Sequence, residues 1–343
     1  MSDDHWLDVL SPVPPARTQP AWSTSSQHGL GHLTKLAPLT SQDEPSIPAR
    51  LRPWALDPIN GDAAALFAVI DASNIFGLEE MLENSGLEHR CLFIGNAFND
   101  LRTQAPWLVR LEDGNRFTAH MFSQGTAPWF LWRHEAHIFL RARDDLGAVW
   151  AHLRRILRFQ DNKSRWQMFR FWQQDFMRFC AETMSLDDAA SNRFFGGGLV
   201  RAVFGLSAND TGWYFSNPNP TDTQAMKSAD LGPIILPLAR RYAWEAFQIK
   251  LFENLKTRYN GKVPEINRED VIHVSETVRA QGYSKENAVA DITEAALIAR
   301  YYGLAFNDLV YTADPAKCLS EATRAKRIKI VVNEAAADLK HGL

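Results

Sequence analysis

Short apolar runs alternate with stretches of helical periodicity between residues 66 and 171, and this alternation limits the possible folds more than any other feature. The candidate strands are residues 66–70, 89–93, 107–111, 137–141 and 167–171, with helices between them. Short runs without polar alternation are typical of buried strands. The pattern predicts an α/β domain with a central sheet. A mixed α+β arrangement is the alternative, because the sequence does not order the strands.

The segment after Asp144 and Asp145 shows the strongest helical periodicity. Acidic residues there favour a helix start, both as N-caps and through the helix dipole. One face of the predicted helix carries Leu146, Val149, Trp150, Leu153, Ile156 and Leu157. The opposite face is predicted to carry His152, Arg154, Arg155 and Arg158, so this helix presents a basic surface.

The character of the chain changes after a run of three glycines, Gly196 to Gly198. Residues 200–206 and 213–215 predict a β-hairpin, and a turn-rich stretch follows at residues 217–220. From residue 236 the periodicity is helical only, with further helices expected at 269–281, 285–302 and 321–339. The sequence therefore predicts a sheet-and-helix domain at residues 63–222 and a helical lobe at residues 223–343.

Residues 1–62 contain nine of the 17 prolines and show no sustained period. We interpret them as an extended arm that wraps over the main body, with the first ordered element at Leu66. The beginning of the chain lacks the layout of a secretory signal, and no apolar run approaches the roughly 20 residues that cross a bilayer. Three distant cysteines fit reduced thiols. We therefore expect a cytoplasmic protein without a membrane segment.

Positive charge is concentrated in one part of the chain. The protein as a whole has a formal net charge of −3, yet residues 133–178 hold ten Lys or Arg and only five Asp or Glu, interleaved with aromatic residues. Such a stretch fits nucleic-acid binding, a protein interface, or an ordinary core with solvated arginines. The overall acidity favours a protein partner and not nucleic acid. The candidate partner-binding residues are Arg154, Arg155, Arg158, Arg165, Trp166, Arg170 and Trp172.

The sequence offers little support for catalysis. The glycine run lacks the Lys and Ser/Thr of a phosphate-binding loop, so a plain turn is the better interpretation. His134 and His137 would need a helix to converge on a metal, and His137 is predicted to open a strand. Cys91 lies within an apolar strand and is predicted to be an inert thiol. We predict no catalytic residue, metal site or cofactor, with an unrecognised hydrolase as an alternative.

Five segments together resemble a known family. They are Ala68–Ala72, Arg90–Phe93, Pro106–Leu111, His152–Arg155 and Phe169–Phe171. In this order and spacing they are similar to the adaptor or chaperone domain of type VI secretion effectors, found in the Tap or TEC proteins. The resemblance covers about residues 64–182, with a weaker echo to about residue 330. Gln173 and Gln174 stand where relatives commonly have Asp-Pro, which leaves the local turn open.

The resemblance implies a non-catalytic adaptor. Such a protein would bind one cognate type VI effector, a toxin, and load it onto the VgrG spike protein. Neither nucleic acid nor a membrane is an expected partner. The alternative that rests on the residues themselves is a nucleic-acid-binding protein that uses the basic and aromatic segment 146–179.

Overall fold

The computed structural model describes residues 46–59, 61–143, 145–161, 163–184, 188–206, 212–216, 232–260, 266–315 and 319–341. The chain divides into two compact units between Leu238 and Ala239, and the described strands all belong to the first. The domain boundary predicted near residue 222 lies outside the described residues. Residues 1–45 of the predicted arm lie outside them as well.

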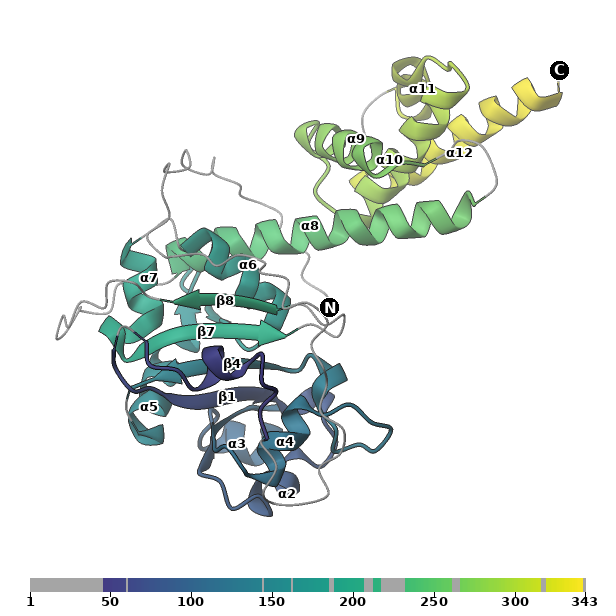
Figure 1. Cartoon of the computed structure of the whole chain (residues 1–343). Helices are drawn as coiled ribbons and strands as arrows, with labels where there is room; N and C mark the ends of the chain where they lie inside the picture. Colours follow the sequence, from purple (N-terminus) through teal and green to yellow (C-terminus); the bar gives the residue numbers. More distant parts are fainter. Residues whose placement is uncertain are drawn as a thin grey trace. The chain divides into compact units, whose positions relative to one another are not determined.

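A six-stranded sheet organises the N-terminal unit (Figure 1). Its order is β2-β3-β1-β4-β7-β8, and every neighbouring pair is antiparallel. The unit is therefore mixed α+β, the second of the two arrangements left open by the sequence, and a mainly helical part follows it as predicted. The strands are β1 (Ala65–Asp71), β2 (His89–Cys91), β3 (Pro106–Leu111), β4 (His137–Ala142), β7 (Val200–Leu206) and β8 (Gly212–Ser216).

Helices cover both faces of this sheet. On one face, α1 (Arg52–Ala55), α2 (Leu78–Glu83) and α4 (Arg116–Phe122) contribute to a core in which Phe139 of β4 stacks on Phe122 and Phe204. Near the opposite face, α5 (Leu146–Ile156) lies against β3, while α6 (Gln174–Met184) and α7 (Asp188–Phe195) lie against β7. Because both faces are buried, these antiparallel strands show continuous apolar runs instead of alternation.

The segment before β1 is part of the folded unit. Ile47, Leu51 and Ala55 are buried in the core, so the predicted first ordered element at Leu66 is wrong. Arg141 of β4 is fully buried and donates hydrogen bonds to the carbonyl oxygens of Trp54, Asp57 and Ala64, at 2.7 to 3.3 Å. This arginine ties the segment to the sheet.

Helix α5 confirms the predicted N-cap and corrects the predicted basic face. Asp145 caps this helix by accepting a 2.8 Å hydrogen bond from the amide of Ala148. The helix ends at Ile156, and Arg158 begins a strand instead of extending the basic face. His152 is buried with its Nε2 2.7 Å from the carbonyl oxygen of Phe194, so it does not belong to an exposed face.

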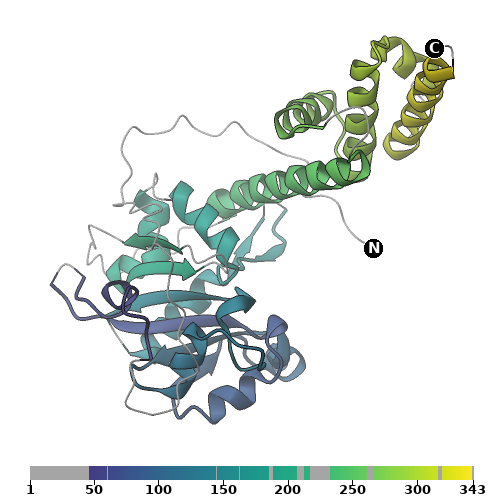
Figure 2. The ribbon, with the colours of Figure 1, turned by 45° about the vertical axis from the view of Figure 1, so that its right-hand side comes forward.

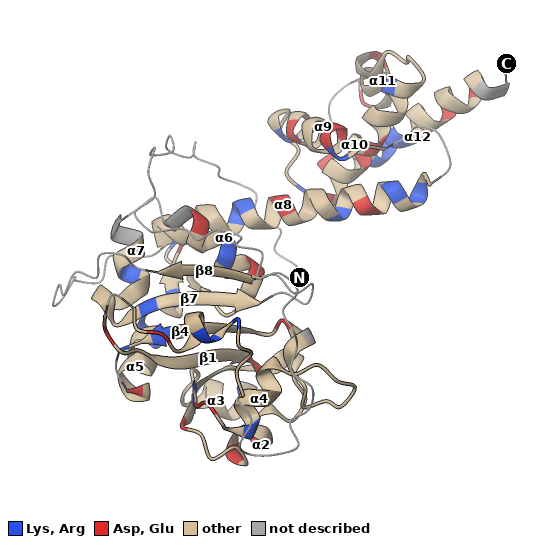
Figure 3. Cartoon of the chain, in the orientation of Figure 1, with Lys and Arg blue, Asp and Glu red and all other residues tan. Residues whose placement is uncertain are grey.

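The C-terminal unit is helical (Figure 2). Helices were predicted over most of this region, and α11 was missed. Its core joins apolar residues of α8 to those of α9, α10 and α12. Lys, Arg, Asp and Glu are mixed along these helices, so no single sign dominates (Figure 3). The helices are α8 (Gly232–Arg258), of which residues 239–258 belong to this unit, α9 (Arg268–Ala280), α10 (Glu286–Tyr301), α11 (Phe306–Ala313) and α12 (Glu321–His341).

A buried carboxylate links three elements of this unit. Glu294 of α10 accepts hydrogen bonds from Arg258 and Tyr259, and lies 2.9 Å from the ammonium of Lys329. Burial alone would raise the pKa of Glu294, but the hydrogen bonds from Arg258 and Lys329 lower it below its usual value. The network therefore keeps a charged group inside the unit.

No described helix is both long and apolar enough to cross a bilayer.

Candidate functional site

A two-stranded hairpin forms the centre of the basic and aromatic segment. Strands β5 (Arg158–Gln160) and β6 (Trp166–Met168) pair antiparallel and join no other strand of the described chain. Successive side chains of a strand point to opposite faces. On the inner face, Leu157, Phe159 and Phe169 are buried, so that face is part of the core.

The outer face of the hairpin is exposed and combines apolar with basic side chains. Trp166 is 64% exposed and Met168 is 40% exposed, which is unusual for large apolar residues. Arg158 pairs with Met168 across the two strands, and Gln160 pairs with Trp166; both β5 residues are exposed. We call Arg158, Gln160, Trp166 and Met168 the hairpin face.

Asp161 holds the turn of the hairpin in shape. Its carboxylate accepts hydrogen bonds from the amides of Lys163 and Arg165, each at 2.9 Å, and from the side chains of Arg165 and Gln167. Ser164 adopts a left-handed conformation with φ of 57°. Local carboxylate-to-amide bonds of this kind are typical of Asp in turns. The charge of Asp161 is thus engaged within the turn.

The Asp161 carboxyl is expected to titrate near pH 2. The amide of Arg165, followed by that of Lys163, holds its pKa down from 3.8 to about 2. Because the folded pKa is the lower one, the stabilisation of the turn is complete above about pH 4 and is lost as the pH falls through 2. Carboxyl chemical shifts in an NMR titration would measure this, with Asp161→Asn identifying the resonance. A midpoint near 3.8 would contradict the turn geometry.

The chain leaves the hairpin through a buried anchor. The indole Nε1 of Trp172 donates to Oδ2 of Asp71 at 3.0 Å, and the guanidinium of Arg170 approaches the same oxygen at 3.3 Å. The other oxygen accepts from the hydroxyl and amide of Ser73. Asp71 and Trp172 are both almost fully buried. The strand predicted at residues 167–171 therefore ends at Met168. Residues 169–172 instead fix the hairpin to the end of β1.

The basic residues of α5 differ in environment. Arg154 lies over the ring of Trp150 at 4.7 Å, and Arg90 lies over the same ring at 3.5 Å. The indole N–H of Trp150 donates to the carbonyl oxygen of Cys91. Arg154 is consequently half-buried by packing, whereas Arg155 is exposed at the end of the helix.

The structure thus sorts the predicted partner-binding residues. Trp172 is buried, and Arg154 and Arg170 are held by Trp150 and Asp71. Five are exposed: Arg155, Arg158, Arg165, Trp166 and Arg170, although Arg170 also pairs with Asp71. Whether they bind a partner stays a prediction.

Sequence reasoning missed Gln160 and Met168 of the hairpin face. It assigned residue 158 to the preceding helix and extended the second strand to residue 171. A signal was present, because alternating RFQ and WQM segments flank the turn-forming sequence Asp-Asn-Lys-Ser-Arg. The strands of three residues were too short to stand out against the helical period.

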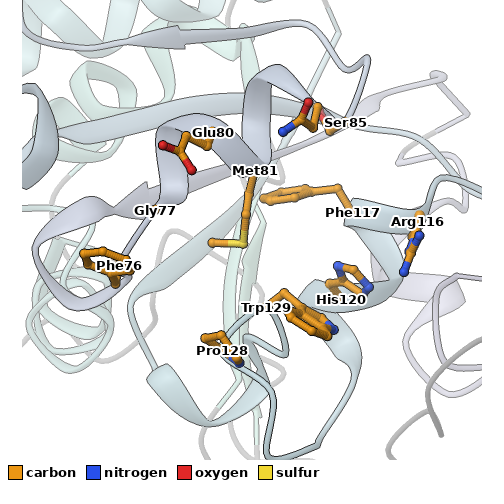
Figure 4. A pocket seen from close by; sticks show the side chains of 11 residues that line it. Phe76, Gly77, Glu80, Met81, Ser85, Arg116, Phe117, His120, Pro128 and Trp129 are labelled. Carbon is orange, nitrogen blue, oxygen red and sulfur yellow. The ribbon is translucent and has the colours of Figure 1, made fainter.

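A second exposed apolar feature lies between α2 and α4 (Figure 4). It is a groove of about 530 Å³, lined by apolar and polar side chains, with Glu80 on one wall and Arg116 on another. Phe76 at its margin is 96% exposed. The apolar lining residues include Phe76, Met81, Phe117, Pro128 and Trp129.

The residues weighed above as a metal ligand, a nucleophile and a phosphate-binding loop lie in the environments of core and turn residues. Burial lowers the pKa of His137 to about 4, and the residue opens β4 as predicted. Burial raises the pKa of the Cys91 thiol to about 11. Gly196–Gly198 follow α7 and precede β7, the reverse of the strand-to-helix order of a phosphate loop. Within the described ranges, no three His, Cys, Asp or Glu side chains are placed to hold a metal ion.

A protein-family model matches residues 66–191, within the sheet-containing unit. Its description is "Domain of unknown function (DUF4123)", and this domain is known in type VI secretion effector adaptor proteins of the Tec/Tap kind. The matched range includes both strands of the hairpin and the Asp71 anchor. No curated protein and no solved structure matches the chain.

Proposed function

We propose that this protein is a non-catalytic adaptor that binds a cognate type VI effector in the cytoplasm and loads it onto the VgrG spike protein. The observation that carries the proposal is the DUF4123 match over residues 66–191, because this domain is known in effector adaptors. The sequence resemblance noted above points the same way.

The hairpin face supports the proposal on physical grounds. Protein interfaces are enriched in aromatic residues, Met and Arg, and the hairpin face exposes one of each. An adaptor also has to release its cargo, so a small face suits it better than an extensive one. We place the recognition of one partner on this face, together with Arg155 and Arg165.

The experiment compares capture by the wild-type protein and by the double variant Arg158→Glu, Trp166→Ala. The bait is the full chain, and the candidates are the effector and spike proteins encoded beside it. We expect the variant to bind its partner about thirtyfold more weakly, because a central exposed aromatic residue contributes 2 kcal/mol or more to a typical interface. Binding is measured by calorimetry on the purified proteins.

A matched control changes the same kinds of residue elsewhere. Arg268→Glu and Tyr311→Ala alter an exposed arginine and a 66% exposed aromatic residue of the C-terminal unit. This control is expected to bind like the wild type. Full binding by the hairpin-face variant would remove this face from the proposal. Failure of the wild type to bind any neighbour-encoded protein, with salt-sensitive binding to an oligonucleotide instead, would favour the nucleic-acid alternative.

A further inference from the structure

The register of the β5–β6 hairpin determines where its backbone groups point. The amide of Phe169 donates to the carbonyl of Leu157, and the amide of Asp161 donates to the carbonyl of Arg165. Hydrogen-bonded and non-hydrogen-bonded pairs alternate along an antiparallel ladder. The pairs Arg158–Met168 and Gln160–Trp166 are therefore non-hydrogen-bonded, and their N–H and C=O groups point away from the hairpin.

The hairpin consequently has two outer backbone edges. Neither β5 nor β6 pairs with another strand in the part of the chain that the structure describes. The outer edge of β5 carries Arg158 and Gln160, polar residues of the kind that discourage strand pairing. The outer edge of β6 carries Trp166 and Met168, whose exposed side chains would lie beside those of an added strand. The outer edge of β6 is therefore better suited than that of β5 to pair with an added strand.

The charges around this edge define the partner further. Residues 158–168 contain three basic residues, Arg158, Lys163 and Arg165, and one acidic residue, Asp161. The carboxylate of Asp161 is engaged by the turn, at 2.9 Å from Nε of Arg165. Arg158 and Lys163 are exposed. A segment with acidic residues beside its apolar ones would complement this distribution.

We infer that the outer edge of β6 binds an extended segment of the partner by β-strand addition. This inference rests on the proposed function, since the partner is taken to be a polypeptide. Backbone hydrogen bonds to Trp166 and Met168 would supply affinity, and apolar side chains at alternate positions of the segment would lie beside these two residues. Acidic residues of the segment would lie near Lys163 and Arg158.

Amide hydrogen exchange on the wild-type protein tests the inference directly. Overlapping peptides that tile the neighbour-encoded effector and spike proteins are the probes, and the full chain is the receptor. We expect the amides of Trp166 and Met168 to exchange at least about tenfold more slowly with a binding peptide. The amide of Gln167, which points into the hairpin, is the internal control and should change little.

A pair of variants at one position provides the second test. Met168→Pro removes the outward N–H, and proline is tolerated at strand edges. Met168→Thr shortens the side chain but keeps the N–H. We expect the proline variant to bind at least about tenfold more weakly than the threonine variant, since it loses a hydrogen bond and its ring obstructs the added strand.

The outcomes separate the two proposals. Peptide binding without slower exchange at Trp166 and Met168 would overturn strand addition and leave the adaptor function intact. Slower exchange at Arg158 and Gln160 instead would assign the partner to β5 and would also overturn the inference. If neither the peptides nor the whole neighbour-encoded proteins bind, the adaptor function fails and the inference fails with it. Should Met168→Pro not fold, the exchange measurement still decides.

Discussion

Replacing Arg141 by leucine is expected to lower the free energy of unfolding by about 3–5 kcal/mol. The guanidinium is fully buried and donates to the carbonyl oxygens of Trp54, Asp57 and Ala64. Leucine would leave these part-buried carbonyl oxygens without their donor, and each hydrogen bond to a charged group contributes about 1.5–3 kcal/mol. Urea denaturation followed by circular dichroism measures the change.

The matched control is Arg110→Leu on β3, which is separated from β4 by β1 in the same sheet. Arg110 forms a 3.3 Å ion pair with Glu88, and both side chains are substantially exposed. Exposed pairs contribute about 0–1 kcal/mol, so this variant should remain close to the wild type. Limited proteolysis should also cut residues 46–64 faster in Arg141→Leu than in the control. Equal stability of the two variants would refute the role assigned to Arg141.

Replacing Trp172 by alanine is expected to cost about 3–5 kcal/mol of stability. The indole is 2% exposed, packs against Phe171 with ring centres 5.4 Å apart, and donates to Asp71. Alanine would leave a cavity and remove a donor from a buried carboxylate. Because Trp172 follows the hairpin in the chain, the loss should also loosen the hairpin.

Trp166→Ala is the comparison for this experiment. Trp166 lies six positions earlier in the chain, but it is 64% exposed. We expect its removal to change stability by less than about 0.5 kcal/mol. Trp172→Ala should thus lower the stability of the protein, whereas Trp166→Ala should affect only the binding of a partner. A stability loss in Trp166→Ala comparable to that in Trp172→Ala would mean that the hairpin face is packed and not available to a partner.

Local features of the fold could be predicted because neighbouring residues cause them. The apolar run at residues 66–70 became β1, and Asp145 became the cap of α5. The helices at 269–281, 285–302 and 321–339 were predicted from periodicity. Short elements such as β5 and α11 were missed, since three to eight residues carry too little periodicity to register.

Part of the candidate site was also accessible from the sequence. The density of arginine and aromatic residues between 146 and 179 pointed to the segment that contains the exposed hairpin. It did not identify which face of that segment is exposed. The helix was extended through Arg158, and this assignment hid the alternation that places Arg158 opposite Met168.

The sequence alone determined the order of most elements, their polarity and the clustering of positive charge, because these depend on residues close together in the chain. Only the tertiary structure decided which of two tryptophans is buried. Asp71 lies 101 residues before Trp172 and holds its indole inside, whereas no such partner holds Trp166 within the described chain. Burial depends on contacts between distant segments, and those contacts are set by strand order and register, which local pattern does not specify.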